Sequence, residues 1–246
     1  TKTRTDAPAM ADAAPTRWTE HRHADGDALA AALARAVGER LHAGLHVRGT
    51  ALLAVSGGST PRRFLRALAE LALDWSRVTV TVTDERQVPP THERSNERLV
   101  REHLLREAAA AARFVSLHAD AADAEAGLAA VAARIDALPL PFDVLVLGMG
   151  NDGHVASLFP GADRLREALD PRGKARVLPL RADAAGEPRL SLTLPALTAT
   201  RALYLHIEGE AKRAVFEQAM AAESDLLPVA TVVRAAPVVT QLYWCP

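Results

Sequence analysis

The chain has 246 residues, 49% of them hydrophobic, which is enough to bury one large core. The formal net charge is -1 and basic and acidic residues are interspersed, so the composition excludes a strongly charged surface that would attract nucleic acid or an anionic membrane. Any anionic ligand therefore needs a local binding site. The single cysteine, Cys245, excludes an internal disulfide and favours a reducing compartment, and we expect a free surface thiol there.

Residues 1–15 are small, polar and rich in Ala and Pro, and we expect a flexible tail there, followed by a single α/β catalytic domain over residues 16–246. No apolar signal-peptide segment follows Lys2 and Arg4, and no uncharged apolar run reaches the roughly 18 residues of a membrane span. The expectation is a soluble, cytoplasmic protein without a membrane partner. The sequence does not decide the oligomeric state, and both a monomer and a homodimer are compatible with it.

The first predicted elements are a helix, a strand and a second helix. Apolar residues recur at helical spacing over residues 27–43, and Gly44 is placed to end that helix. Ala51–Val55 is a short apolar run, typical of a strand covered on both faces. A polar loop follows, and Pro61 begins the next helix. The later expected elements are strands at 78–83, 142–147, 177–180, 190–194, 202–207 and 229–233, and helices at 96–107, around Val155 and at 210–222.

Alternating strands and helices predict a layered α/β fold with a mainly parallel sheet. In such sheets, ligands bind at the carboxyl ends of the strands. The loops that follow the strands at 51–55, 78–83 and 142–147 are therefore the candidate functional segments.

The first of these loops, Ser56–Pro61, has the composition of an anion-binding turn. Two glycines and two hydroxyl side chains stand directly before a helix, where unpaired backbone N–H groups and the helix dipole favour an anion such as phosphate. An ordinary tight turn with Thr60 as N-cap explains the same residues equally well. The loop lacks the lysine of a nucleotide P-loop, which argues against ATP or GTP.

The second loop begins with Asp84, Glu85 and Arg86 at the end of an apolar strand. Arg86 could bind phosphate or an oxyanion, and Asp84 could orient a group that transfers a proton. A local ion pair beside an exposed Glu85 is the alternative.

The third loop, Gly148–His154, is rich in glycine and ends in a histidine. Its G-x-G-x-x-G spacing lies in mid-chain without the following acidic strand end, so we discount a nicotinamide cofactor. Asp152 and His154 project from the loop at the strand's carboxyl end, where a general base would be useful, since histidine side chains titrate near neutral pH. A histidine that caps backbone groups is the simpler alternative.

The other charged candidates stand alone in the sequence. The remaining histidines lack metal-ligand spacing, so we expect no metal site. Arg189 precedes a predicted strand and Lys212 opens a predicted helix, and each by itself fits a solvated surface charge.

Five segments together carry a family resemblance that runs from about Trp18 to the C-terminus. In chain order they are S-G-G-S-T-P at 56–61, T-D-E-R-Q-V-P at 83–89 with S-N at 95–96, G-M-G-N-D-G-H-V-A-S-L-F-P-G at 148–161, R-L-S-L-T-L-P at 189–195 and E-G-E-A-K at 208–212. They resemble the glucosamine-6-phosphate isomerase/6-phosphogluconolactonase family, in its lactonase branch. Five motifs in order are far more specific than any one of them.

The resemblance implies a Rossmann-like three-layer α/β/α fold. It implies hydrolysis of 6-phospho-D-glucono-1,5-lactone to 6-phospho-D-gluconate, in the oxidative pentose phosphate pathway, without metal or organic cofactor. The residues that it implies for the substrate phosphate are Gly57, Gly58, Ser59 and Thr60, assisted by Arg189 and Lys212.

For the chemistry, the resemblance implies His154 as the base that activates water. Asp152 or Asp84 would orient the imidazole, and Arg86 would stabilise the substrate or developing negative charge.

Two alternatives remain. Glucosamine-6-phosphate deaminases resemble this chain in the phosphate loop and the D-G-H segment. They typically continue into N-E-P-G, where this chain has the run Ser157 to Gly161, and they have D-E-Y where this chain has D-E-R at 84–86. Both departures favour the lactonase branch. A sugar-phosphate-binding module without catalysis would need no base at His154, and it would usually carry a DNA-binding domain, for which the short N-terminal tail leaves no room.

Overall fold

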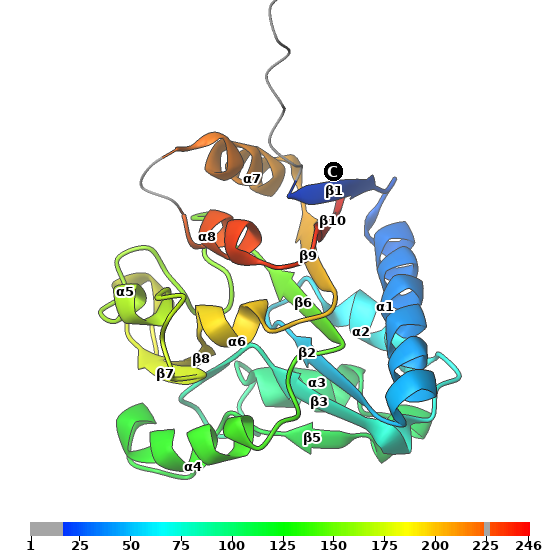
Figure 1. The fold of residues 1–246 in the computed structure, drawn as a ribbon, viewed down its shortest axis with the longest axis horizontal. Helices are drawn as coiled ribbons and strands as arrows, with labels where there is room; N and C mark the ends of the chain where they lie inside the picture. The colour runs from blue at the N-terminus through cyan, green and yellow to red at the C-terminus, as the bar shows by residue number, and fades with distance from the viewer. Residues whose placement is uncertain (1–16, 224–226) are drawn as a thin grey trace, which may run out of the picture.

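The computed structural model describes residues 17–223 and 227–246 as a layered α/β fold (Figure 1). Its main sheet has seven strands, and every neighbouring pair is parallel. Across the sheet the strands are β1 (Trp18–Arg22), β10 (Thr240–Cys245), β9 (Leu203–Glu208), β6 (Val144–Gly148), β2 (Ala51–Val55), β3 (Val78–Val82) and β5 (Arg113–Val115). The predicted α/β class with a mainly parallel sheet is confirmed.

Helices cover both faces of this sheet, which gives the three layers. Figure 1 shows α1 and α2 on one side of the strands and α6 and α8 on the other. The helices are α1 (Gly26–Arg48), α2 (Arg62–Ala69), α3 (Asn96–His103), α4 (Ala124–Asp136), α5 (Leu165–Ala168), α6 (Leu194–Thr198), α7 (Glu210–Ala221) and α8 (Pro228–Ala235). Because both faces are covered, the central strand β2 is buried along its whole length.

A second, smaller sheet is antiparallel. It consists of β4 (Asp84–Arg86), β8 (Arg189–Leu192) and β7 (Val177–Leu180), in that order. The segment from Asp84, predicted to be a loop, is thus a short strand, because it pairs with β8 in a register that places Arg86 opposite Arg189. Residues directly opposite in an antiparallel pair share one face, so this sheet brings two guanidinium groups together.

The order of the main sheet fixes where a ligand binds. From β2 the chain moves outward to β3 and β5, then returns to β6 on the other side of β2 and continues to β9 and β10. The direction of winding therefore reverses between β2 and β6. At such a point the loops after the two strands diverge and leave a crevice at their carboxyl ends.

The helix predicted to end at Gly44 continues to Arg48, so that prediction was wrong. Gly44 is buried inside α1, where an added Cβ would lie 3.1 Å from the Asp143 side chain. Its small size serves close packing of the helix on the sheet. The helix ends at Gly49, whose φ of 78° is left-handed and whose N–H donates to the carbonyl of Leu45.

Two other element predictions were wrong. No helix forms around Val155, which instead makes an isolated bridge with Leu158. The valine-rich segment 229–233, predicted as a strand, lies in α8, because Pro228 starts a helix and Val229, Val232 and Val233 then share its buried face.

The last strand is β10, which buries Cys245 to 1% exposure, so the expected surface thiol is also wrong. The predicted tail over residues 1–15 lies outside the described residues.

The C-cap of α1 gives a test of backbone strain. An added Cβ at Gly49 would have no neighbour within 4 Å, so Gly49→Ala introduces strain alone. We expect a loss of about 1–2 kcal/mol in the free energy of unfolding, measured by urea denaturation. Gly49→Asn should lose less, because asparagine adopts this conformation more readily. Equal losses in the two variants would contradict this account.

Candidate active site

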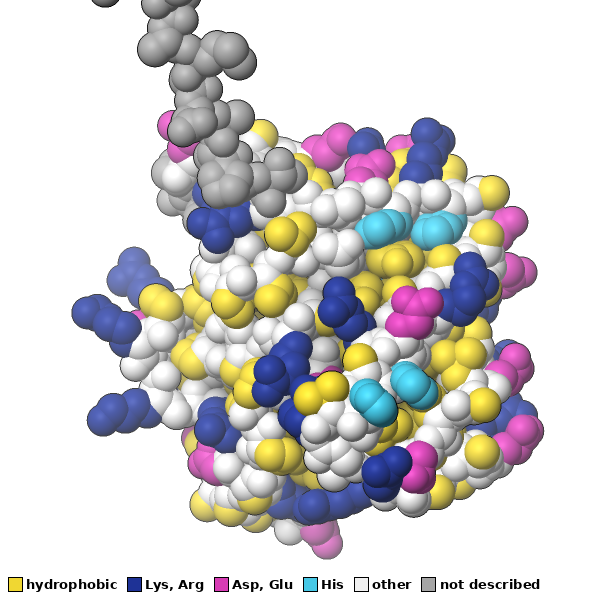
Figure 2. Space-filling model, turned by 45° about the vertical axis from the view of Figure 1, so that its right-hand side comes forward, with side chains coloured by type: hydrophobic (Ala, Val, Ile, Leu, Met, Phe, Trp, Pro, Cys, Tyr) yellow, Lys and Arg dark blue, Asp and Glu magenta, His cyan; other side chains and the backbone are white. Residues whose placement is uncertain are grey.

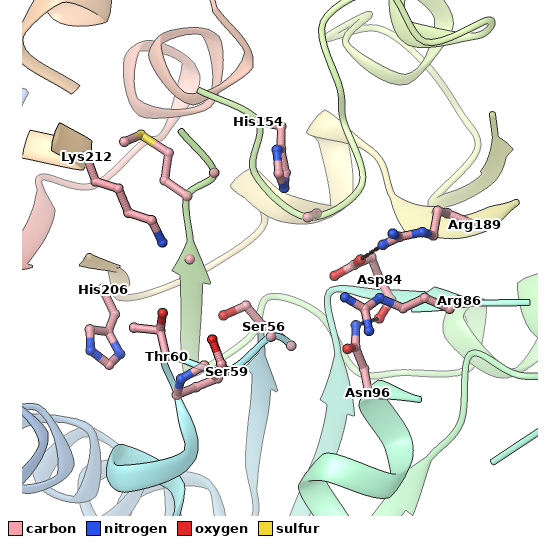
Figure 3. Close-up of a pocket in the computed structure, with 17 residues that line it drawn as sticks. Ser56, Ser59, Thr60, Asp84, Arg86, Asn96, His154, Arg189, His206 and Lys212 are labelled. Carbon is pink, nitrogen blue, oxygen red and sulfur yellow. Dashed lines mark hydrogen bonds and ion pairs between the residues drawn. The ribbon is translucent and has the colours of Figure 1, made fainter. Parts of the chain in front are cut away.

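A pocket of about 230 Å³ opens at the carboxyl edge of β2, β3, β6 and β9 (Figure 3). It is lined by every residue that the sequence proposed for the site except Asp152, which contacts the ring of His154. The lining residues are Ser56, Gly57, Gly58, Ser59, Thr60, Pro61, Asp84, Arg86, Asn96, Gly148, Met149, Gly150, His154, Ala156, Arg189, His206 and Lys212.

The glycine loop after β2 forms one wall of the pocket. Gly58 has a φ of 94°, which glycine adopts without strain. Gly57 lies against α3, and a Cβ there would fall 1.8 Å from Oδ1 of Asn96. The N-cap of α2 is Pro61 and no side chain caps the helix, so Thr60 is not its N-cap. The N–H groups of the first turn are thus left for water or a ligand.

Lys212 faces the same end of the pocket from the first turn of α7. Figure 3 shows its ammonium group pointing towards Thr60. Burial lowers the pKa of Lys212, while the nearby Glu208 carboxylate acts in the opposite direction. The loop and Lys212 together make a site suited to a compact anion.

His154 is held by Asp152 in a tight local turn. Nδ1 of the ring lies 2.5 Å from Oδ1 of Asp152, and the same oxygen accepts the backbone N–H of His154 at 3.2 Å. A Cβ on Gly150 would lie 2.2 Å from the ring, so the turn requires glycine there. Because Nδ1 is engaged with a carboxylate, the ring presents Nε2 as its free, basic nitrogen.

The ring of Phe159 supports two of the site's polar side chains. Its centroid lies 4.1 Å from that of His154, and the guanidinium carbon of Arg189 lies 5.5 Å from the same ring. Phe159 is itself buried, so both polar groups pack against a fixed apolar surface.

Asp84 belongs to a buried network and not to the His154 pair. Ser157 donates from Oγ to Oδ2 of Asp84 at 2.6 Å, and Nη1 of Arg189 lies 3.8 Å from the same oxygen. Burial lowers the pKa of Arg189, although a guanidinium stays charged at any physiological pH. Since Asp84 and Arg189 are both buried, each stabilises the charge of the other, and Glu187, with an oxygen 4.0 Å from Nη2, adds to the stabilisation of Arg189.

Glu85, which the alternative reading of this segment placed at the surface, is buried and fixes the start of α3. Its carboxylate accepts the backbone N–H groups of Arg86, Asn96 and Glu97 and the Ser95 hydroxyl. Burial raises the pKa of Glu85, and the backbone N–H groups counteract this. The anchored helix delivers Asn96 to the pocket, where Nδ2 donates to the carbonyl of Asp84 at 2.8 Å.

The pocket has two ends. In Figure 3, Ser59, Thr60, His206 and Lys212 lie on one side and Asp84, Arg86 and Arg189 on the other, with His154 between them. The sequence assigned Arg189 and Lys212 to the same phosphate, and that assignment stays a prediction.

Sequence reasoning gave no role to two lining residues, Asn96 and His206. Asn96 was quoted in a motif, and only the fold shows that it reaches the pocket. His206 looked like part of an apolar strand, although its place near that strand's carboxyl end was a usable signal.

The fold and the pocket define a class: Rossmann-like α/β proteins whose strand-end loops surround a polar pocket with a histidine–carboxylate pair. A family model described as glucosamine-6-phosphate isomerases/6-phosphogluconolactonase matches residues 24–244. The chain therefore belongs to this family and is one of its 6-phosphogluconolactonase-type enzymes.

Relatives and solved structures agree with this placement. A 6-phosphogluconolactonase from Rhizobium meliloti (strain 1021) is 51% identical over 227 residues, which cover 92% of this chain and 98% of the relative. One from Pseudomonas aeruginosa is 46% identical over 87% of this chain and 89% of its own. The crystal structure of a 6-phosphogluconolactonase from Shewanella baltica OS155 has a TM-score of 0.90 and 36% identity, over 93% of this chain and 98% of that one.

Within residues 17–223 and 227–246, no helix is both long and apolar enough to cross a membrane. The same part of the chain holds no group of three or more His, Cys, Asp and Glu side chains arranged to bind a metal ion.

Alanine substitutions of Asp84 and Asp152 should differ in their effect on the stability of the fold. Asp84→Ala removes the nearer carboxylate from the buried Arg189 and leaves only Glu187 at 4.0 Å, so we expect a loss of about 3 kcal/mol in the free energy of unfolding, measured by urea denaturation. Asp152→Ala is the matched control, because that side chain is 43% exposed and should cost well under about 1 kcal/mol. Similar losses in both variants would remove the distinction.

Proposed function

We propose that this chain hydrolyses 6-phospho-D-glucono-1,5-lactone to 6-phospho-D-gluconate, with His154 as the base that activates water. The observation that carries the proposal is the 2.5 Å contact between Nδ1 of His154 and Asp152, in a pocket whose other wall is a glycine loop facing Lys212. The relatives named 6-phosphogluconolactonase support the substrate class.

The glycine loop and Lys212 bind the phosphoryl group of the substrate. Backbone N–H groups at the start of α2, the hydroxyls of Ser59 and Thr60 and the ammonium of Lys212 supply donors around a dianion. This fixes the sugar at one end and leaves its lactone carbonyl in the middle of the pocket.

His154 then removes a proton from a water molecule through Nε2 while the water oxygen bonds to C1 of the lactone. The electron pair of the C1 carbonyl moves onto its oxygen, which becomes an oxyanion. When the oxyanion collapses, the bond between C1 and the ring oxygen breaks, and the imidazolium returns the proton to that oxygen as the C5 hydroxyl. The new carboxylic acid loses its proton to solvent.

Asp152 keeps the base in the right tautomer. Its carboxylate accepts from Nδ1–H of His154, which leaves Nε2 free and stabilises the imidazolium that forms. The exposed position of Asp152 supports this role over Asp84, which is engaged with Ser157 and Arg189.

Arg86 and Arg189 supply positive charge opposite Lys212. Their cross-strand pairing on β4 and β8 places both in the pocket beside Asp84. Negative charge that develops on the carbonyl oxygen, or on the product carboxylate, is stabilised by this pair. The geometry favours this role for Arg189 over the phosphate contact predicted from the sequence.

A deaminase is the second candidate, but the pocket favours the lactonase. The deaminase acid of N-E-P-G falls at Phe159 in this chain, an apolar side chain that packs against His154 and cannot transfer a proton. A cytoplasmic location, a monomeric or homodimeric state and the 16–246 catalytic domain stay predictions of the sequence.

The first test concerns the base. With lactone generated from glucose-6-phosphate by its dehydrogenase and the spontaneous rate subtracted, the wild type should accelerate lactone loss well above the blank at pH 6.5 to 7. His154→Ala should lower kcat at least about a hundredfold, because it removes the only proposed proton acceptor. His118→Ala, a histidine outside the pocket, should leave the rate unchanged.

If the wild type merely matches the blank, the lactonase proposal fails. If His154→Ala stays fast, the activity stands and the mechanism fails.

The second test concerns Lys212 and pH. Burial lowers the pKa of this lysine, so the ammonium is fully charged well below the lowered pKa and is lost as pH rises through it. Binding of 6-phospho-D-gluconate, measured by calorimetry from pH 7 to 10, should weaken at a lower pH than an ordinary lysine would require. Lys212→Arg should bind with a flat profile, since its charge persists. A profile that falls equally in both proteins would assign the pH dependence to another group.

A further inference from the structure

The pocket contains a second histidine that the proposed mechanism does not use. His206 lies on β9 with only 2% of its side chain exposed, yet it lines the pocket. Its register partner on β6 is Gly148, the last residue of that strand, so the ring lies at the sheet edge where the loops converge. Figure 3 shows the ring beside Thr60 and below Lys212, at the anion-binding end.

A partly exposed carboxylate holds this ring by one nitrogen. Nε2 lies 3.2 Å from Oε1 of Glu208, whose other oxygen accepts a hydrogen bond from Nη2 of Arg63 at 2.8 Å. The hydrogen bond from His206 is the main reason why the pKa of Glu208 is lowered, with Arg63 adding to it. The carboxylate is therefore ionised at neutral pH and can only accept, so Nε2 must carry the proton.

The second ring nitrogen is the group that remains. Within residues 17–223 and 227–246, the hydrogen bond from Nε2 to Glu208 is the only one that the His206 side chain makes, so Nδ1 has no partner there. Burying a polar ring costs free energy that an apolar side chain of the same volume would not cost. A buried imidazole that lines a ligand pocket with one nitrogen unpaired is therefore suited to contact the ligand through that nitrogen.

We propose that His206 is a substrate-binding residue that contacts the phosphoryl group through Nδ1, and that Glu208 and Arg63 are the residues that position it. This inference rests on the proposed function, which puts the phosphoryl group between the glycine loop and Lys212. A phosphoryl oxygen and an unprotonated Nδ1 both accept, so one proton is shared between them, carried by the ring or by the phosphoryl group, whose second pKa is about 6.

Two polar substitutions of His206 distinguish the role of Nδ1 from that of Nε2. Asparagine at position 206 reaches roughly the place of Nδ1, and glutamine reaches the place of Nε2. His206→Gln should keep the contact to Glu208 but lose the phosphoryl group, raising KM for the phosphorylated lactone about tenfold to a hundredfold with kcat within about twofold. His206→Asn should retain most of the affinity, although it loses Glu208.

Inorganic phosphate is the direct probe of the same contact. As a competitive inhibitor of lactone hydrolysis, its Ki should rise in His206→Gln by the same factor as KM, and should change little in His206→Asn. Glu208→Gln should give an intermediate rise, because the ring is then less firmly oriented. His21→Leu is the matched control, a hydrogen-bonded strand histidine outside the pocket, and should change neither constant.

The outcomes distinguish this inference from the function beneath it. An unchanged KM and Ki in His206→Gln, or a larger loss in His206→Asn than in His206→Gln, would mean that the ring only serves Glu208, and the inference would be overturned. If phosphate does not compete in the wild type, the phosphate site of the proposed function fails, and the role of His206 fails with it.

Discussion

The parallel pairing of β9, β6, β2 and β3 is the constraint on which the site depends. Parallel strands all end at one edge, so segments from 56–61, 84–86, 148–154 and 206–212 meet there although they lie far apart in the chain. Strands buried on both faces hold this register, because a slip by one residue would move each side chain to the opposite face. The apolar core thus fixes the positions of the segments that line the pocket.

Buried polar groups convert that edge into fixed positions for the functional side chains. Glu85 holds the first turn of α3, and Asp84 holds Arg189 and Ser157, so the walls of the pocket are set by hydrogen bonds within the protein. Space-filling colouring shows basic, acidic and histidine side chains spread over the visible surface, without one dominant charge (Figure 2). With a net charge of -1, attraction of an anion must come from these local groups.

The sequence predicted the parallel core and the loops after β2 and β6, because apolar runs and glycine clusters are local signals. It predicted the segment from Asp84 as a loop, since its pairing with β8 is a contact between residues distant in sequence. It predicted α8 as a strand, since a valine run has the same composition in either element and only Pro228 and burial decide. It could not separate Asp84 from Asp152, because the difference lies in burial and in contacts with Ser157 and Arg189, which are distant in sequence. His206 needed the register of β9 against β6 to be placed at all.

The pocket holds two histidine–carboxylate pairs with the same chemistry and opposite geometry. Asp152 engages Nδ1 of His154 and leaves Nε2 free, whereas Glu208 engages Nε2 of His206 and leaves Nδ1 free. His154 lies on a loop with 26% of its side chain exposed, so water reaches it and its proton can exchange. His206 lies on a strand with 2% exposed and is also tied to Arg63 through Glu208, so it is suited to hold an anion and poorly placed to activate water. In the proposed mechanism, position in the fold, more than residue type, therefore divides binding from proton transfer.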